Sequence, residues 1–223
     1  QPTTPSTNNV FNTEVVKTDT NVVDVVKAQV ESAQNSAPTV APVDTKGHWA
    51  EKTVDIFVKL GVIKGYEDGT AKPNQEITRA EFVSVLSRIF TVSGTKQIAL
   101  NDVNNHWAQQ AIKQFASAGV IDGYGDGTFQ PNKTISREEM VVILSRIVNM
   151  QAVQKDTTKG NFADLNGSFA SDAIKQAAQA GIISGKDGSQ FDPKANSTRA
   201  EALTVILNAL TLNPEINTLL DTL

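Results

Sequence analysis

The 223-residue chain contains no cysteine, and this absence removes several kinds of chemistry at once. Without cysteine there is no disulfide frame, no thiolate nucleophile and no cysteine-based zinc site. Only two histidines, His48 and His106, remain as imidazole ligands or bases. The composition otherwise fits a globular protein that can bury a core, because 39% of the residues are hydrophobic and 20% are charged.

The chain also lacks an excess of positive charge and any long apolar run. Its formal net charge is −4 at pH 7, whereas phosphate recognition normally needs a clear surplus of lysine and arginine, so no nucleic-acid partner is expected. No stretch approaches the roughly 18 apolar residues of a membrane-spanning helix, so we expect no membrane insertion. The start at Gln1 has no signal-peptide character, and we expect a segment of a longer chain.

Residues 1–43 differ in composition from the rest. The stretches QPTTPSTNN and SAPTVAPVDT combine proline with small polar residues, which is typical of linkers. Between them, four valines at near-helical spacing predict a helix from Asp19 to Gln34. These valines are Val22, Val23, Val26 and Val30. We therefore expect residues 1–43 to form a linker that includes a helix.

From residue 44 onward one pattern occurs three times. Constant shifts of 58 and then 62 residues align seven positions in every copy. The three sets are Asp44, Trp49, Gly61, Gly65, Pro73, Arg79 and Glu81; Asp102, Trp107, Gly119, Gly123, Pro131, Arg137 and Glu139; and Asp164, Phe169, Gly181, Gly185, Pro193, Arg199 and Glu201. Such agreement indicates tandem repeats, which we place at 44–99, 100–161 and 162–211. A short helix is expected at 212–223, where a capping Asn precedes Pro.

Each repeat has the pattern helix, loop, helix. Apolar residues in each second helix follow the i, i+3, i+4, i+7, i+8 spacing of an amphipathic helix. They are Phe82, Val85, Leu86, Ile89 and Phe90; Met140, Ile143, Leu144, Ile147 and Val148; and Ala202, Val205, Ile206, Ala209 and Leu210. One such helix pair cannot bury its apolar faces alone, whereas three pairs around a common axis can. The expected fold is therefore mainly α.

The second helices open with the capping-box pattern S/T-x-x-E, in which the hydroxyl and the glutamate satisfy amides at the helix start. The six residues with this structural role are Thr78, Glu81, Ser136, Glu139, Thr198 and Glu201. The arginine inside each box is less easily explained. Arg79, Arg137 and Arg199 occupy the first helical position, where the helix dipole disfavours a cation by about 0.3–1 kcal/mol.

A bound anion would resolve this conflict, because free helix-start amides, the dipole and the guanidinium would then favour the same negative group. The alternative is a salt bridge to a nearby carboxylate of the protein. The repeated Asp44, Asp102 and Asp164 are the examples that we consider.

The loops between the helices, 65–70, 123–128 and 185–190, contain turn residues that present backbone amides, next to Tyr66, Tyr124 or Lys186. Such loops suit a polar ligand, although ordinary turn chemistry accounts for part of the glycine content. Calcium is disfavoured because acidic ligands are few and no bidentate glutamate has the required spacing. We expect neither a metal nor a cofactor.

Trp49, Trp107 and Phe169 begin the first helices and are expected mainly to pack into the core, with stacking on a sugar as the alternative. The histidines that precede the tryptophans are replaced by Ser168 in the third repeat, so a metal or catalytic role is disfavoured. Glu138 and Glu139 are neighbours on one helix and do not form a paired acid and base. No catalytic residue emerges, and the chain is not expected to be an enzyme.

On these residues the three units resemble S-layer homology domains. The resemblance rests on HWA with AGVIDGYGDGTFQPNKTISREE in the second repeat and on KLGVIKGYEDGTAKPNQEITRAE in the first, and it covers residues 43 to 211. It implies a pseudo-threefold assembly with a central helical bundle and with ligand grooves between neighbouring repeats. The third repeat departs from the pattern at Phe169, Lys186 and Asp187, so its groove is expected to differ.

The resemblance also implies a secreted, monomeric module at the bacterial cell wall, fused to a larger surface protein. Its implied partner is an anionic, pyruvylated secondary cell-wall polysaccharide attached to peptidoglycan. The residues implied for glycan binding are Arg79, Arg137 and Arg199, which would engage the pyruvyl carboxylate, and Gly65, Gly123, Gly185, Tyr66, Tyr124 and Lys186, which would contact the sugar. Trp49 and Trp107 are further candidates. A structural protein–protein module of a surface lattice, without glycan binding, remains the alternative.

Overall fold

The computed structural model describes residues 9–223, and the linker expected at QPTTPSTNN lies almost wholly outside this range. The described part is mainly helical, and its only strand-like pairing consists of isolated bridges. The helices are α1 Thr13–Val16, α2 Asp19–Asn35, α3 Glu51–Lys59, α4 Arg79–Ser87, α5 Gln109–Ser117, α6 Arg137–Ile147, α7 Ser171–Gln179, α8 Arg199–Thr211 and α9 Pro214–Leu220. The predicted mainly α architecture is confirmed.

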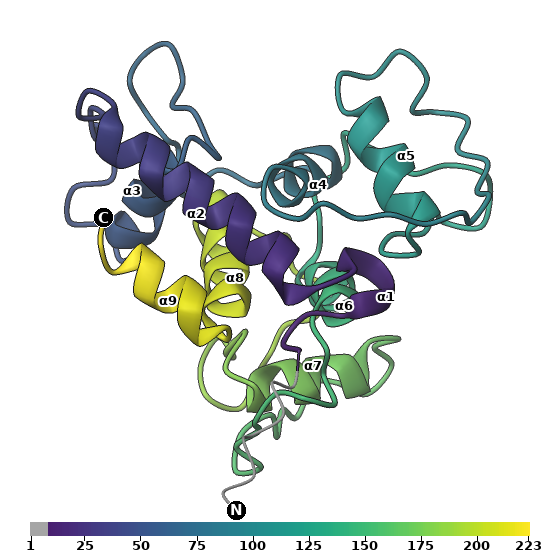
Figure 1. Cartoon of the computed structure of the whole chain (residues 1–223). Helices are drawn as coiled ribbons and strands as arrows, with labels where there is room; N and C mark the ends of the chain where they lie inside the picture. The colour runs from purple at the N-terminus through teal and green to yellow at the C-terminus, as the bar shows by residue number, and fades with distance from the viewer. Residues whose placement is uncertain (1–8) are drawn as a thin grey trace, which may run out of the picture.

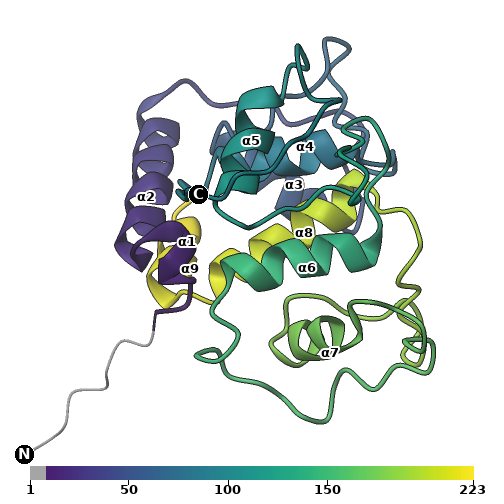
Figure 2. The same cartoon turned by 90° about the vertical axis from the view of Figure 1, so that its right-hand side faces the viewer.

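The helices of one repeat pack against helices of other repeats. α5 packs on α4, α7 on α6, and α3 returns to pack on α8, so the first helix of each repeat covers the second helix of the preceding one. Figures 1 and 2 show this arrangement, with α6 and α8 side by side. α4, α6 and α8 are buried on most of their surface, whereas α3, α5 and α7 bury one stripe. The three repeats therefore close a ring around their second helices.

Three backbone hydrogen bonds mark the pseudo-threefold axis of this ring. The amide of Ile77 donates to the carbonyl of Ser197, Ser197 donates to Ile135, and Ile135 donates to Ile77, each at 3.0 Å. All three side chains are fully buried or nearly so. Because each bond joins different repeats, the assembly depends on contacts between residues that are far apart in the sequence.

The N-terminal segment that sequence analysis assigned to a linker is, in its described part, largely packed against the ring. Phe11 is fully buried and its strand bridge to Val148 is antiparallel. The carboxylate of Asp19 accepts hydrogen bonds from the amides of Val10 and Phe11 and from the side chain of Asn213. α2 lies along α9, as Figure 1 shows, and the four valines predicted to form its stripe are buried. Periodicity predicted this helix, but it carries no information about what covers the stripe.

The expected second linker, at residues 36–45, forms no helix and exposes Val40 and Val43. No helix within residues 9–223 combines the length and the apolar character needed to cross a bilayer.

Candidate functional site

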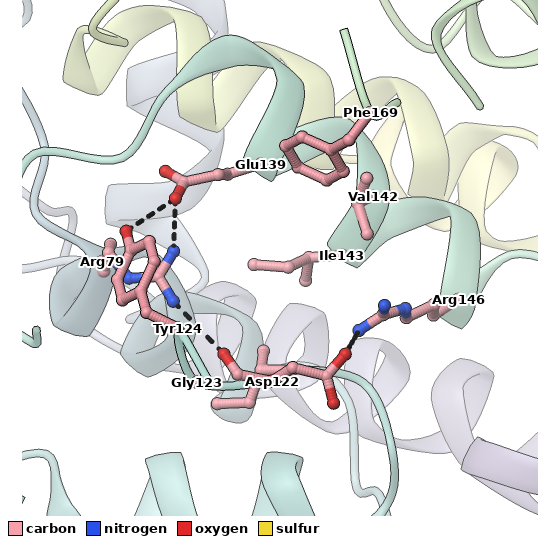
Figure 3. Close-up of a pocket in the computed structure, with 10 residues that line it drawn as sticks. Arg79, Asp122, Gly123, Tyr124, Glu139, Val142, Ile143, Arg146 and Phe169 are labelled. Atoms are coloured by element: carbon pink, nitrogen blue, oxygen red, sulfur yellow. Dashed lines mark hydrogen bonds and ion pairs between the residues drawn. The ribbon is translucent and has the colours of Figure 1, made fainter. Parts of the chain in front are cut away.

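A pocket of about 270 Å³ lies where the first and second repeats meet, with one side chain from the third repeat at its edge (Figure 3). We call it the Arg79 groove. Arg79 comes from the start of α4, and Gly123 and Tyr124 come from the loop of the second repeat. Its remaining walls include Ile121, Asp122, Glu139, Val142, Ile143, Arg146 and Phe169. The ring of repeats therefore brings the helix-start arginine, the loop and an aromatic residue to one place, although they are distant in sequence.

The guanidinium of Arg79 is held inside the protein by partners on the second repeat. Its Nη1 donates to Glu139 Oε1 at 2.9 Å, and its Nε donates to the carbonyl of Phe129 at 2.9 Å. Its Nη2 lies 3.4 Å from the carbonyl of Asp122. The guanidinium carbon also lies 4.4 Å from the centre of the Phe129 ring and 4.6 Å from that of Tyr124. Only 6% of this side chain is exposed, so Arg79 joins two repeats before any ligand is considered.

The other two arginines repeat this arrangement with looser ion pairs. Arg137 lies 3.6 Å from Glu201 and donates to the carbonyls of Phe191 and Ser184, and 5% of its side chain is exposed. Arg199 lies 3.5 Å from Glu81 and donates to the carbonyl of Ala71, and 13% of its side chain is exposed. Each arginine therefore reaches the capping glutamate of the next repeat around the ring.

None of the three arginines is left without a carboxylate, since each pairs with a glutamate of the next repeat. The salt-bridge alternative describes the geometry, but with a different partner. Asp44, Asp102 and Asp164 instead accept hydrogen bonds from two consecutive backbone amides at the far end of each loop, such as Phe129 and Gln130 for Asp102. Both hydrogen bonds of each predicted capping box are present, and the box glutamate also receives the arginine.

The helix-start amides are not free for an anion either. The amide of Arg79 donates to the carbonyl of Lys133, and that of Ala80 donates to the carbonyl of Pro131. The same bonds recur at the other two junctions between repeats. The hydroxyl of the capping box accepts a hydrogen bond from the third amide. All three amides at the helix start are therefore used within the protein and do not bind a ligand.

The loops use their own amides in the same way. The amide of Tyr124 donates to the carbonyl of Thr128, which closes the loop on itself. A Cβ at Gly123 would come within 2.5 Å of that carbonyl oxygen, so close approach of the backbone explains this glycine. The Tyr66 and Lys186 amides make the equivalent bonds. The loops therefore contribute side chains to the grooves, namely those of Tyr66, Tyr124 and Lys186, and not free backbone amides.

Tyr124 and Lys186 both contact the glutamate that holds an arginine. The hydroxyl of Tyr124 donates to Glu139 Oε1 at 2.7 Å, and Lys186 Nζ lies 2.5 Å from Glu201 Oε1. Burial, followed by the hydrogen bond to Glu139, raises the pKa of Tyr124 far above its ordinary value, so its hydroxyl stays a donor. Burial lowers the pKa of Arg137, and the charge of Glu201 opposes this shift.

Three aromatic residues at equivalent positions are the main exposed apolar side chains of the repeats. Trp49 is 65% exposed, Trp107 is 64% exposed and Phe169 is 71% exposed. The expected core packing is therefore wrong. Phe169 instead stands at the edge of the Arg79 groove. A single sequence gives no sign of this, because an aromatic residue that begins a helix has the same pattern whether a neighbour covers it or not.

Four residues line the groove but were not predicted from the sequence: Asp122, Val142, Ile143 and Arg146. Arg146 pairs with Asp122 at 2.8 Å and links α6 to the loop of its own repeat. Arg146 also donates to the carbonyl of Val120, and the matching side chains Arg88 and Asn208 donate to the carbonyls of Val62 and Ile182, so alignment of the repeats offered a signal for this position. No group of His, Asp and Glu suited to hold a metal occurs among residues 9–223.

Comparison with known proteins agrees with the repeat pattern. The family model described as "S-layer homology domain" matches residues 43–83, 99–141 and 161–203. The chain is 32% identical over 173 residues to an amylopullulanase of Thermoanaerobacterium thermosulfurigenes. The aligned region covers 75% of this chain and 9% of that protein. It is 30% identical over 179 residues to an S-layer protein of Bacillus licheniformis, covering 79% of this chain and 20% of the relative.

A third relative is a cellulosome-anchoring protein of Acetivibrio thermocellus, 30% identical over 160 residues, which amount to 68% of this chain and 36% of the relative. The chain thus spans well under half the length of each of these relatives. The similarity to the amylopullulanase is confined to a small fraction of that enzyme.

Proposed function

Because the chain belongs to the S-layer homology domain family, we propose that it anchors a larger exported protein non-covalently to the cell wall by binding a pyruvylated polysaccharide attached to peptidoglycan. The family and its S-layer relatives assign the chain to the bacterial cell surface. The anchoring role follows the cellulosome-anchoring relative. The amylopullulanase relative is matched over only 9% of its length, and the role proposed for the matched module is non-catalytic.

The observation that carries the proposal is the Arg79 groove with an exposed aromatic residue at its edge. An aromatic face held in water is suited to stacking on a sugar ring, and Phe169 offers such a face beside polar groups that can orient the sugar. Charge supports an anionic ligand. Lys133 lies over Tyr124 and Lys96 pairs with Asp122. The cations near the groove are Arg79, Lys96, Lys133 and Arg146, and the carboxylates are Asp122, Glu138 and Glu139.

In this proposal the arginine has two roles. Its ion pair with Glu139 sets the shape of the groove floor, and its positive charge attracts the pyruvyl carboxylate. The carboxylate does not need free helix-start amides, which the repeats use among themselves. Lys186 and Tyr66, with Arg137 and Arg199, form the corresponding polar groups at the other two junctions.

A binding assay with purified wall polymer tests the proposal. The chain should sediment with the native polymer, and removal of pyruvate should abolish most of this binding. Replacement of Phe169 with Ala should weaken binding without unfolding the chain, because the side chain is 71% exposed. Equal binding before and after removal of pyruvate would overturn the ligand assignment. Self-association without any polymer binding would favour the lattice module, which the internal ion pairs of all three arginines also permit.

A further inference from the structure

In the first two repeats a histidine holds the segment that begins the first helix. The amide of Ala50 donates to His48 Nδ1 at 3.0 Å, so the proton lies on Nε2, which donates to Asn74 Oδ1 at 2.9 Å. His106 makes the same two bonds, to Ala108 and Asn132. Each histidine therefore ties the tryptophan that follows it to the loop of its own repeat.

The third repeat lacks both members of this pair, because Ser168 and Lys194 occupy the positions of the histidine and the asparagine. Ser168 Oγ still accepts from the amide of Ala170, at 3.1 Å. Its hydroxyl donates to Glu138 Oε2 at 2.7 Å. The hydrogen bond of Ser168 therefore joins the third repeat to α6 of the second repeat.

Glu138 is unusual at its position. The first and third repeats have Ala80 and Ala200 there, and both are fully buried. Glu138 is only 7% exposed, and a carboxylate at that depth needs a partner. Ser168 supplies a hydrogen bond, and the positive end of α6 favours the negative charge at the second helical position. The glutamate thus has a specific environment that the other repeats do not contain.

This tie connects two walls of the Arg79 groove. α6 carries Glu139, Val142 and Ile143, and Phe169 follows Ser168 directly. In the first two repeats the tryptophan is tied only to its own loop, whereas Phe169 is tied to the helix that forms the groove. We propose that Glu138 is a positioning residue that fixes the aromatic wall of the Arg79 groove, and that the hydrogen bond to Ser168 makes this groove rigid before the glycan arrives. The inference rests on the proposed function, since it concerns the same ligand.

Pre-organisation has a measurable consequence here. Phe169 packs little against the protein, so its ring position depends on how firmly the backbone at 168–170 is held. A wall that is already ordered loses less conformational freedom when a sugar binds. If the Phe169 side chain must instead be ordered when the sugar binds, the affinity should fall by about three- to tenfold.

The test compares four versions of the full chain on purified pyruvylated polymer. E138A should bind about three- to tenfold more weakly than the natural chain, whereas E138Q, which keeps an acceptor for Ser168, should bind nearly as well. The triple variant E138A/S168H/K194N transplants the histidine–asparagine tie of the other repeats and should recover most of the affinity. Equal affinities of E138A and the natural chain would overturn the proposal, as would a triple variant no better than E138A.

A second measurement needs no ligand and so separates this proposal from the proposed function. In the background W49F/W107F/F169W the indole at 169 is the only tryptophan, and its fluorescence anisotropy reports the mobility of the wall. Addition of E138A should lower the anisotropy, and S168H/K194N should restore it. A chain that binds no polymer but shows these changes refutes the glycan assignment alone. Unchanged anisotropy refutes the positioning role, and urea unfolding of each variant identifies any that is globally destabilised.

Discussion

The Arg79 junction and the Arg199 junction are built from the same motif but differ in how tightly they close. Arg79 makes a 2.9 Å ion pair, and each of its three nitrogens has a hydrogen-bond partner. Arg199 lies 3.5 Å from Glu81, and its Nη2 has no hydrogen-bond partner among the described residues. The exposed fraction of Arg199 is about twice that of Arg79. The Arg79 junction therefore serves mainly to join two repeats. At the Arg199 junction the guanidinium is more accessible to a ligand.

Two substitutions between the repeats account for this difference. Phe129, whose ring lies under Arg79, corresponds to the small Ala71 under Arg199, so one aromatic face is missing. The ion pair of Asp122 with Arg146 corresponds to two cations, Lys64 and Arg88. An anion would thus meet more positive charge beside Arg199 and better-formed walls beside Arg79. Repeats that share a motif therefore need not share a ligand preference.

The largest expected effect comes from removing each arginine. R79A leaves Glu139 without its buried partner and should lower the free energy of unfolding by about 3–5 kcal/mol. R199A should cost about 1–2 kcal/mol, because its pair is longer and Glu81 remains one-third exposed. Urea unfolding followed by circular dichroism measures both. Equal losses would contradict this prediction and mean that the two junctions are energetically alike.

A smaller effect is expected from supplying the missing aromatic face. A71F places a phenylalanine where Phe129 and Phe191 lie under their arginines and should stabilise the chain by about 1 kcal/mol through a cation–π contact. In the background R199A the same change should give little or nothing. The matched control F129A should weaken the tight junction by about 3 kcal/mol or more. A destabilised A71F would show that the last junction has no room to close.

The difference between these junctions marks the limit of what could be predicted from sequence. The apolar stripes predicted the helices, because a periodic apolar face must be buried, and the S/T-x-x-E pattern predicted their starts. The partner of Arg79 could not be found in this way, since Glu139 lies 60 residues away and meets it only because the ring closes. Trp49 was wrongly expected in the core for a related reason. A local sequence pattern does not show which faces the neighbouring repeats leave exposed.

The axis of the ring offers a third, smaller test of how the last repeat differs. Ser197 occupies the place that Ile77 and Ile135 fill in the other repeats, and its buried hydroxyl has no hydrogen-bond partner among the described residues. S197A removes this desolvated group and should raise the free energy of unfolding by about 0.5 kcal/mol. I135A, as the control, should lower it by about 2–4 kcal/mol. A loss of stability in S197A would indicate that its hydroxyl has a partner in solution.

The smallest effect concerns acid, and it extends the comparison to the junction of Arg137. Burial alone would raise the pKa of Glu201, but hydrogen bonds from Lys186 and the amide of Thr198, with the charges of Lys186 and Arg137, lower it below its ordinary value of 4.5. The unfolded chain then binds this proton more readily, so the contribution of Glu201 is complete above pH 4.5 and is lost as the pH falls below that value.

K186Y gives this junction the tyrosine of the Arg79 junction and removes one cation from Glu201. The pKa of Glu201 should rise towards its ordinary value of 4.5, so as the pH falls below 4.5 the variant should lose less stability than the natural chain, and its loss should level off at a higher pH. Urea midpoints between about pH 3 and pH 6, together with a carboxyl titration by NMR, measure the difference. If the two midpoint curves are parallel, Lys186 does not hold Glu201 in its charged form, and the lysine in place of tyrosine makes no difference to how this junction responds to acid.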